Sequence, residues 1–87
     1  MEYCKVYKND DCTMIYYIMG TWENVATGEH IEIRVEKEED IEVYAEFTLP
    51  AYHCHHAYGF KETELMEIES FLRDNAVLIW DMAREAC

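Results

Sequence analysis

The amino-acid sequence predicts an α+β domain, in which an antiparallel meander of four to five strands packs one face against a long C-terminal helix. Three observations support this prediction. Apolar and charged residues alternate over 31–49, apolar residues recur at helical spacing over 61–86, and the helical segment follows all of the strand segments. A single domain over residues 1–87 is expected, because a chain of 87 residues with 51% apolar content supplies one core.

The first two strands are predicted at 3–8 and 13–19, on either side of a turn signal at 9–11. Residues 13–19 are rich in β-forming residues and apolar on both faces, which is typical of an interior strand that is covered on both sides. The segment 20–29 has no clear period, although Trp22 fits a short strand within it.

The clearest local pattern predicts a β-hairpin over 31–49. Outside the loop, the odd-numbered positions from Ile31 to Leu49 are apolar and the even-numbered positions between them are mostly polar. This period of two predicts one buried face and one wetted face. Because the apolar positions of both strands are odd-numbered, paired residue numbers must sum to an even number. A three-residue loop satisfies this condition, unless a bulge shifts the register by one.

Pro50 ends this hairpin, and a fifth strand is predicted at 52–58. From residue 61 onward the apolar period becomes helical. One narrow stripe contains Leu65, Ile68, Leu72, Ala76, Ile79, Ala83 and Ala86. The phase of the stripe continues past Asp74, so one long helix is predicted, with a kink near Asp74 as the alternative.

The charge balance limits the classes of partner. The chain has seven Lys and Arg residues and 19 Asp and Glu residues. The resulting net charge of −12 argues against direct nucleic-acid binding. No apolar run approaches the roughly 20 residues that a membrane span needs, and residues 1–4 do not lead into a signal sequence. We therefore expect a cytoplasmic protein with no membrane contact and with reduced thiols at Cys4, Cys12, Cys54 and Cys87.

Carboxylates concentrate on the predicted hairpin and its loop. The side chains expected to engage a partner are Glu32, Glu36, Glu38, Glu39, Asp40, Glu42 and Glu46. A solvated sheet face that keeps the protein in solution is one interpretation. The leading hypothesis is a small acidic binding protein that docks on the basic surface of a protein partner. Inhibitors of nucleic-acid-handling enzymes, of the phage counter-defence type, belong to this class by analogy of size and charge.

The sequence His53-Cys54-His55-His56 is the most unusual local feature. Imidazole and thiolate groups suit zinc, so all four side chains are candidate metal ligands. In an extended strand His53 and His55 share one face while Cys54 and His56 share the other, so at most two ligands converge. Surface histidines beside a packed cysteine are the alternative interpretation. No complete catalytic set is recognisable, so we expect no enzyme activity and no cofactor.

The predicted helix carries more apolar surface than one sheet can cover. Phe71, Leu78 and Met82 lie about 120° from the main stripe. A two-fold homodimer that pairs these helices would bury them, whereas a wide sheet wrapped by 20–29 would do so within one chain. For function, the alternative to partner binding is a small-ligand binding or sequestering protein with an aromatic- or His-lined pocket. Metal binding through the histidine cluster is the third hypothesis.

Overall fold

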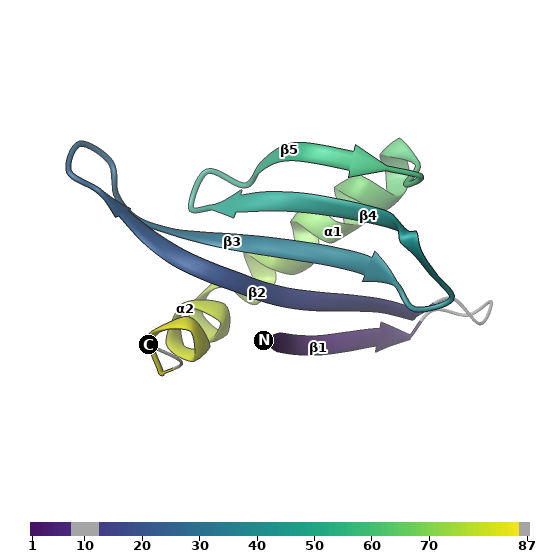
Figure 1. Cartoon of the computed structure of the whole chain (residues 1–87), viewed down its shortest axis with the longest axis horizontal. Helices are drawn as coiled ribbons and strands as arrows, with labels where there is room; N and C mark the ends of the chain where they lie inside the picture. The colour runs from purple at the N-terminus through teal and green to yellow at the C-terminus, as the bar shows by residue number, and fades with distance from the viewer. Residues whose placement is uncertain (8–12, 86–87) are drawn as a thin grey trace.

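The computed structural model describes residues 1–7 and 13–85, and in them five strands precede two helices. The elements are β1 (Glu2–Tyr7), β2 (Thr13–Asn24), β3 (Gly28–Lys37), β4 (Asp40–Leu49), β5 (His53–Tyr58), α1 (Glu62–Asp74) and α2 (Ala76–Glu85). Each strand pairs antiparallel with the next, so the sheet order is β1-β2-β3-β4-β5. Both helices cover the same face of this meander (Figure 1). The α+β class is therefore confirmed.

The register between β3 and β4 confirms the pairing of odd-numbered apolar residues. Ile33 lies opposite Phe47 and Val35 opposite Ala45, and all four side chains are buried. Near the turn the register shifts, so that Lys37 pairs with Asp40 and residues 41–43 have no partner of their own in β3. As a result Ile41 is 69% exposed, although its place in the sequence pattern predicts a buried side chain.

The second strand is longer than its sequence pattern indicates. It runs through Asn24, so the segment without a clear period becomes the far half of a β2–β3 hairpin that extends beyond the other strands (Figure 1). Tyr16 and Ile18 face the helices and are buried. Met19 lies at a register shift and is exposed. The prediction that both faces are covered is therefore wrong at Met19, because both described helices lie on the opposite face of the sheet.

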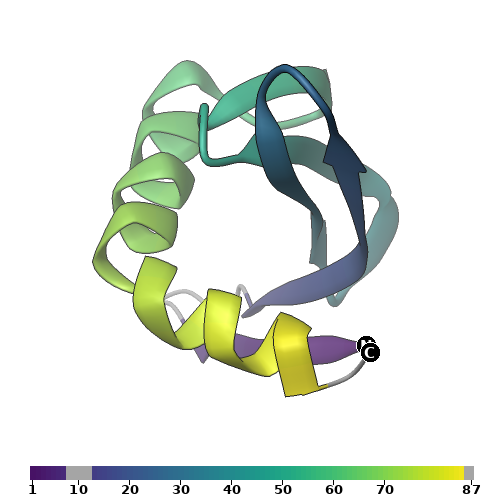
Figure 2. The same cartoon turned by 90° about the vertical axis from the view of Figure 1, so that its left-hand side faces the viewer.

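The predicted single helix is two helices separated at Asn75, next to the position where the alternative prediction placed a kink. The Asn75 side-chain Nδ2 donates to the carbonyl of Phe71 at 2.9 Å, which also accepts the Asn75 backbone N–H. Tyr3 Oη donates to Asn75 Oδ1 at 3.1 Å, which ties the break to β1. Figure 2 shows α2 turned away from the axis of α1. The bend lets the apolar stripe follow the curved sheet, so Leu72 of α1 and Ile79 of α2 are both buried.

The core fills the space between the inner face of the sheet and the two helices. Its buried members are Met14, Tyr16, Ile18, Ile31, Ile33, Val35, Ala45, Phe47, Leu49, Ile68, Leu72, Ile79 and Ala83. Burial raises the pKa of Tyr16 above its ordinary value. Neither of the described helices has the length and apolar content that a membrane crossing requires.

Candidate functional site

The outer face of the sheet holds two of the predicted partner-binding carboxylates in ion pairs with Arg34. Its Nε donates to Glu36 Oε2 at 2.6 Å, and its Nη1 lies 3.6 Å from Glu46 Oε2. The hydrogen bond to Glu36 raises the pKa of Arg34. The guanidinium also lies 4.1 Å from the centroid of the Tyr44 ring. Glu36 and Glu46 are thus already engaged within the chain.

Glu32, the next carboxylate on this face, is also engaged. Its Oε1 lies 2.5 Å from His55 Nε2, and its Oε2 accepts a hydrogen bond from Thr48 Oγ1 at 3.1 Å. The Thr48 pairing follows from the register, which places Glu32 directly opposite Thr48. In the centre of the face predicted to dock on a partner, the carboxylates therefore already contact other side chains of the chain, and Arg34 neutralises part of their charge.

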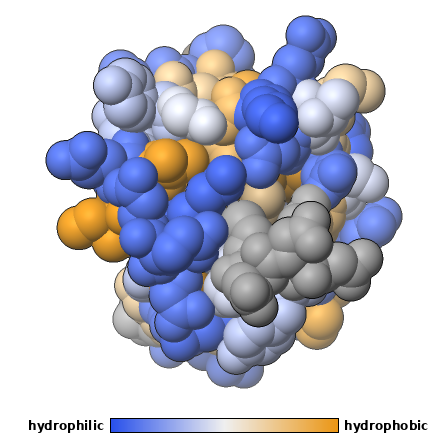
Figure 3. Space-filling model, turned by 90° about the vertical axis from the view of Figure 1, so that its right-hand side faces the viewer, coloured by the Kyte–Doolittle hydropathy of each residue, from blue (hydrophilic) through white to orange (hydrophobic). Residues whose placement is uncertain are grey.

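The remaining predicted carboxylates lie at the β3–β4 turn. Glu38 Oε1 lies 3.5 Å from Lys5 Nζ, and Glu39 Oε2 accepts the backbone N–H of the first residue of β2 at 3.5 Å. Asp40 Oδ1 accepts the backbone N–H of Glu42, whose side chain is exposed. The end of the molecule that carries this turn is mainly hydrophilic (Figure 3). The predicted acidic surface is thus divided between a paired centre and an exposed turn.

The Arg34 network should contribute to stability as well as to surface charge. We expect Arg34→Gln to lower the free energy of unfolding by about 1 kcal/mol, because two half-buried carboxylates lose their shared cation. Urea denaturation at low salt measures the change. Lys5→Gln, which removes an exposed pair, is the control and should leave the midpoint nearly unchanged. Equal shifts for both variants would contradict a special role for Arg34.

The histidine cluster lies on β5, but the strand is not regular there as the sequence prediction required. The register of β4 and β5 places His56 opposite Glu46 and Cys54 opposite Phe47, so His55 is an extra residue in a bulge. The bulge brings both neighbouring histidines to the outer face. Donor atoms of Glu46, His55 and His56 all lie within 4.8 Å of one another. The expectation that His55 and His56 point to opposite faces is therefore wrong.

The other two members of the cluster are placed apart from this group. Cys54 packs against the core and lies beside Phe47 and Leu65 on the helix-covered face. Burial raises the pKa of the Cys54 thiol, which favours its neutral form. His53 stacks near His55 with a ring-centroid distance of 6.3 Å. Cys4 and Cys54 are free thiols, while Cys12 and Cys87 lie outside the described residues.

The three predicted dimer residues do not form one exposed strip. Phe71 packs on Tyr16 with a ring-centroid distance of 4.3 Å, and Met82 is partly buried against the core. Leu78 is 57% exposed, next to the more exposed Val77. Leu78 and Met82 lie on the same helix, α2, so the difference between them arises within α2: Met82 faces the core and Leu78 faces away from it.

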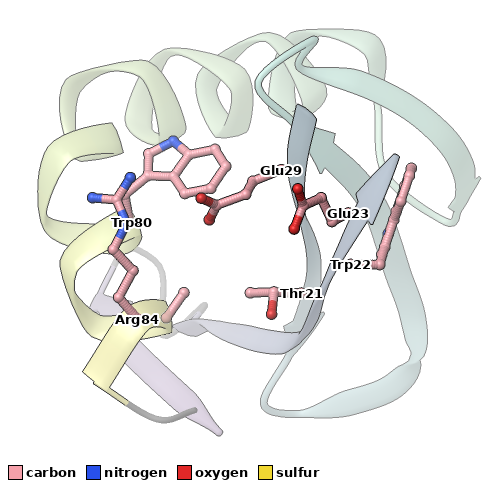
Figure 4. Close-up of a pocket in the computed structure, with 7 residues that line it drawn as sticks. Thr21, Trp22, Glu23, Glu29, Trp80 and Arg84 are labelled. Carbon is pink, nitrogen blue, oxygen red and sulfur yellow. The ribbon is translucent and has the colours of Figure 1, made fainter. Parts of the chain in front are cut away.

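A groove that the sequence did not indicate lies between the extended β2–β3 hairpin and α2. Its volume is about 400 Å³. It is lined by Thr21, Trp22, Glu23, Glu29, Trp80, Ala83 and Arg84. Figure 4 shows the Glu23 and Glu29 carboxylates pointing from the hairpin into the space that Trp80 and Arg84 border from α2. A shallower depression next to it adds Val77 and Asp81.

Glu23 and Glu29 are direct cross-strand neighbours in the β2–β3 register. Like charges in this position destabilise a sheet. Within the described part of the chain, no Lys, Arg or His forms an ion pair with either carboxylate. Arg84 instead lies with its guanidinium 5.5 Å from the centroid of the Trp80 ring. The groove therefore concentrates negative charge beside an aromatic ring.

This pair could have been found only by continuing the hairpin register outward. The turn signal at Thr27-Gly28 is visible in the sequence, and Gly28 has a φ of 86°, which favours glycine. A hairpin closed at that turn places Glu23 opposite Glu29. Trp80 comes from a distant element, and sequence alone gives no signal for its position.

Comparisons with protein-family models, curated proteins and solved structures found no match for this chain. Function therefore has to be inferred from the geometry of the chain's own side chains.

Proposed function

We propose that this protein binds a basic segment of a partner protein in the groove between the β2–β3 hairpin and α2. The observation that supports this most directly is the facing pair Glu23 and Glu29, which has no cationic partner among the described residues. A Lys or Arg side chain placed between the two carboxylates would relieve their repulsion. The proposed function, binding of a basic protein surface, is the one that the sequence predicts. The proposed site is the groove and not the predicted carboxylates of β3, β4 and their turn.

Trp80 adds a second element of recognition. A cation over an indole ring gains about 0.5–2 kcal/mol, depending on how far it is desolvated. The guanidinium of Arg84 near this ring illustrates the contact within the chain. Because Glu23, Glu29 and Asp81 outnumber Arg84 around the groove, the local field still favours a positively charged ligand.

The overall charge favours a protein partner over a nucleic acid. A net charge of −12 repels phosphate and steers association toward basic surfaces. The surfaces by which enzymes hold nucleic acid are basic for the same electrostatic reason. Competition for such a surface, and so inhibition of a nucleic-acid-handling enzyme, is the form of this activity that we propose.

Charge reversal in the groove tests the proposal. A short peptide rich in Arg and Lys is the probe, and calorimetry at low salt measures its affinity. We expect Glu29→Lys to weaken binding at least about tenfold, because it loses one attraction and adds one repulsion, each worth about 1 kcal/mol at exposed sites. Glu42→Lys makes the same change of net charge on the originally predicted surface and is the matched control.

Two results separate the possibilities. Strong loss in Glu29→Lys with a small change in Glu42→Lys supports the groove. Equal losses of affinity in both variants would mean that peptide binding depends only on the net charge of the protein. This outcome contradicts the proposed site. Both substituted side chains are exposed, so we expect both variants to fold. Thermal unfolding of each variant checks this.

A further inference from the structure

The geometry of the outer face points to a metal site, independent of the groove. We propose that Glu46, His55 and His56 bind one divalent transition-metal ion such as Zn²⁺. Their donor atoms lie within 4.8 Å of one another and come from two paired strands, β4 and β5. Rotation of partly or fully exposed side chains can bring such donors to one ion. His55 and His56 were among the metal ligands predicted from the sequence. Glu46 was not.

The bulge at His55 makes this arrangement possible. In a regular strand, adjacent residues point to opposite faces, so two neighbouring histidines could not share an ion. The extra residue between the Glu46–His56 pair and the Phe47–Cys54 pair removes that restriction. Bulges often re-aim side chains at functional sites. The ring centroids of His55 and His56 are 5.5 Å apart.

Neighbouring groups engage two of the ligands and leave one donor atom of each for the ion. Glu32 Oε1 contacts His55 Nε2 at 2.5 Å, which leaves Nδ1 of that ring to coordinate the ion. Glu32 is in turn fixed by Thr48 Oγ1. A carboxylate that accepts from the second ring nitrogen of a ligating histidine is a common outer-shell feature of metal sites. For Glu46, Arg34 lies near Oε2, so Oε1 remains for the ion.

The donor set selects the class of ion. Two imidazoles and one carboxylate suit Zn²⁺ and its neighbours among the divalent transition metals, whereas Ca²⁺ and Mg²⁺ prefer oxygen ligands alone. Three protein ligands leave at least one coordination position for water or another ligand. Cys54 lies on the opposite face, so thiolate ligation is not part of this site.

The test is titration of the reduced, purified chain with Zn²⁺ by calorimetry, supported by the visible spectrum of the Co²⁺ form. We expect one ion per chain, with a Co²⁺ spectrum that has d–d bands and no thiolate charge-transfer band. His55→Ala and His56→Ala should each abolish this binding. His53→Ala changes the neighbouring exposed histidine and should retain it. Glu32→Gln, which alters the outer-shell contact to His55 and leaves all three ligands in place, should weaken binding about 10- to 100-fold.

Other results would overturn the site. Binding that survives His56→Ala but disappears after alkylation of the thiols would assign the ion to cysteines. Equal losses in His53→Ala and His56→Ala would mean that the exposed histidines bind without a defined geometry. Absence of Zn²⁺ binding in the unaltered chain, with native unfolding behaviour, also contradicts the proposal. None of these outcomes depends on whether a basic peptide binds in the groove.

Discussion

Phe47→Ala should lower the free energy of unfolding by about 3–5 kcal/mol. Phe47 is 2% exposed and is one of the largest buried side chains of the core. It lies on β4 opposite Ile33 and is flanked by β5, so its truncation leaves a cavity that neighbouring strands cannot readily fill. Small domains have a total stability of about 5–15 kcal/mol, so this variant should be largely or partly unfolded at moderate urea concentrations.

Ile41→Ala is the matched control for this prediction. Ile41 lies on the same strand and belongs to the same odd-numbered pattern, but the register shift leaves it 69% exposed. We expect its truncation to change the free energy of unfolding by less than about 0.5 kcal/mol. Similar losses for the two variants in chemical denaturation would mean that β4 keeps the regular register to its beginning.

Gly59→Ala is expected to cost about 1–3 kcal/mol, from backbone strain and from steric overlap. Gly59 has a φ of 84°, and a Cβ at this position would lie 2.8 Å from Val43 Cγ2. Val43 is β-branched and has little freedom to rotate away. The chain would have to shift where β5 leaves the sheet for α1.

The other two glycines separate the two contributions. Gly28 also has a positive φ, of 86°, but a Cβ there meets nothing within 4 Å. Gly20 has neither a positive φ nor a close neighbour. Thermal unfolding of the three alanine variants should therefore show the smallest loss at position 20, an intermediate loss at 28 and the largest at 59. A loss at 28 as large as that at 59 would contradict the contact with Val43.

Local patterns predicted much of this fold. The alternation from Ile31 to Leu49 identified the inner face of the central hairpin, and the stripe through Ile68, Leu72 and Ile79 identified the buried side of both helices. These patterns succeed because burial against one face imposes a period of two on strands and 3.6 on helices.

The features that were not predicted, or that were offered only as an alternative, depend on contacts between distant segments. The break at Asn75, close to the alternative kink at Asp74, is tied to the first strand by the hydrogen bond that Tyr3 Oη donates to the Asn75 side chain. The bulge at His55 depends on the pairing of β5 with β4, and adjacent histidines in a strand give no sign of it. No period within one segment carries this information.

The candidate sites show the same division. The acidic binding protein expected from composition stays a prediction, whereas alternation placed Glu32, Glu36 and Glu46 on one face, as the structure has them. Alternation could not show that Arg34 and His55 engage these carboxylates. Nor could it show that a groove forms where the hairpin approaches α2, because its sides come from segments about 50 residues apart.

Binding of a basic segment in that groove is the central claim. Its most direct measurement is nuclear magnetic resonance of the ¹⁵N-labelled chain during titration with the peptide rich in Arg and Lys. We predict that the largest shift changes occur at the Glu23 and Glu29 amides and at the Trp80 indole N–H. Changes centred on residues 38–46, with the Trp80 signal unmoved, would contradict the groove and return the binding surface to the β3–β4 turn.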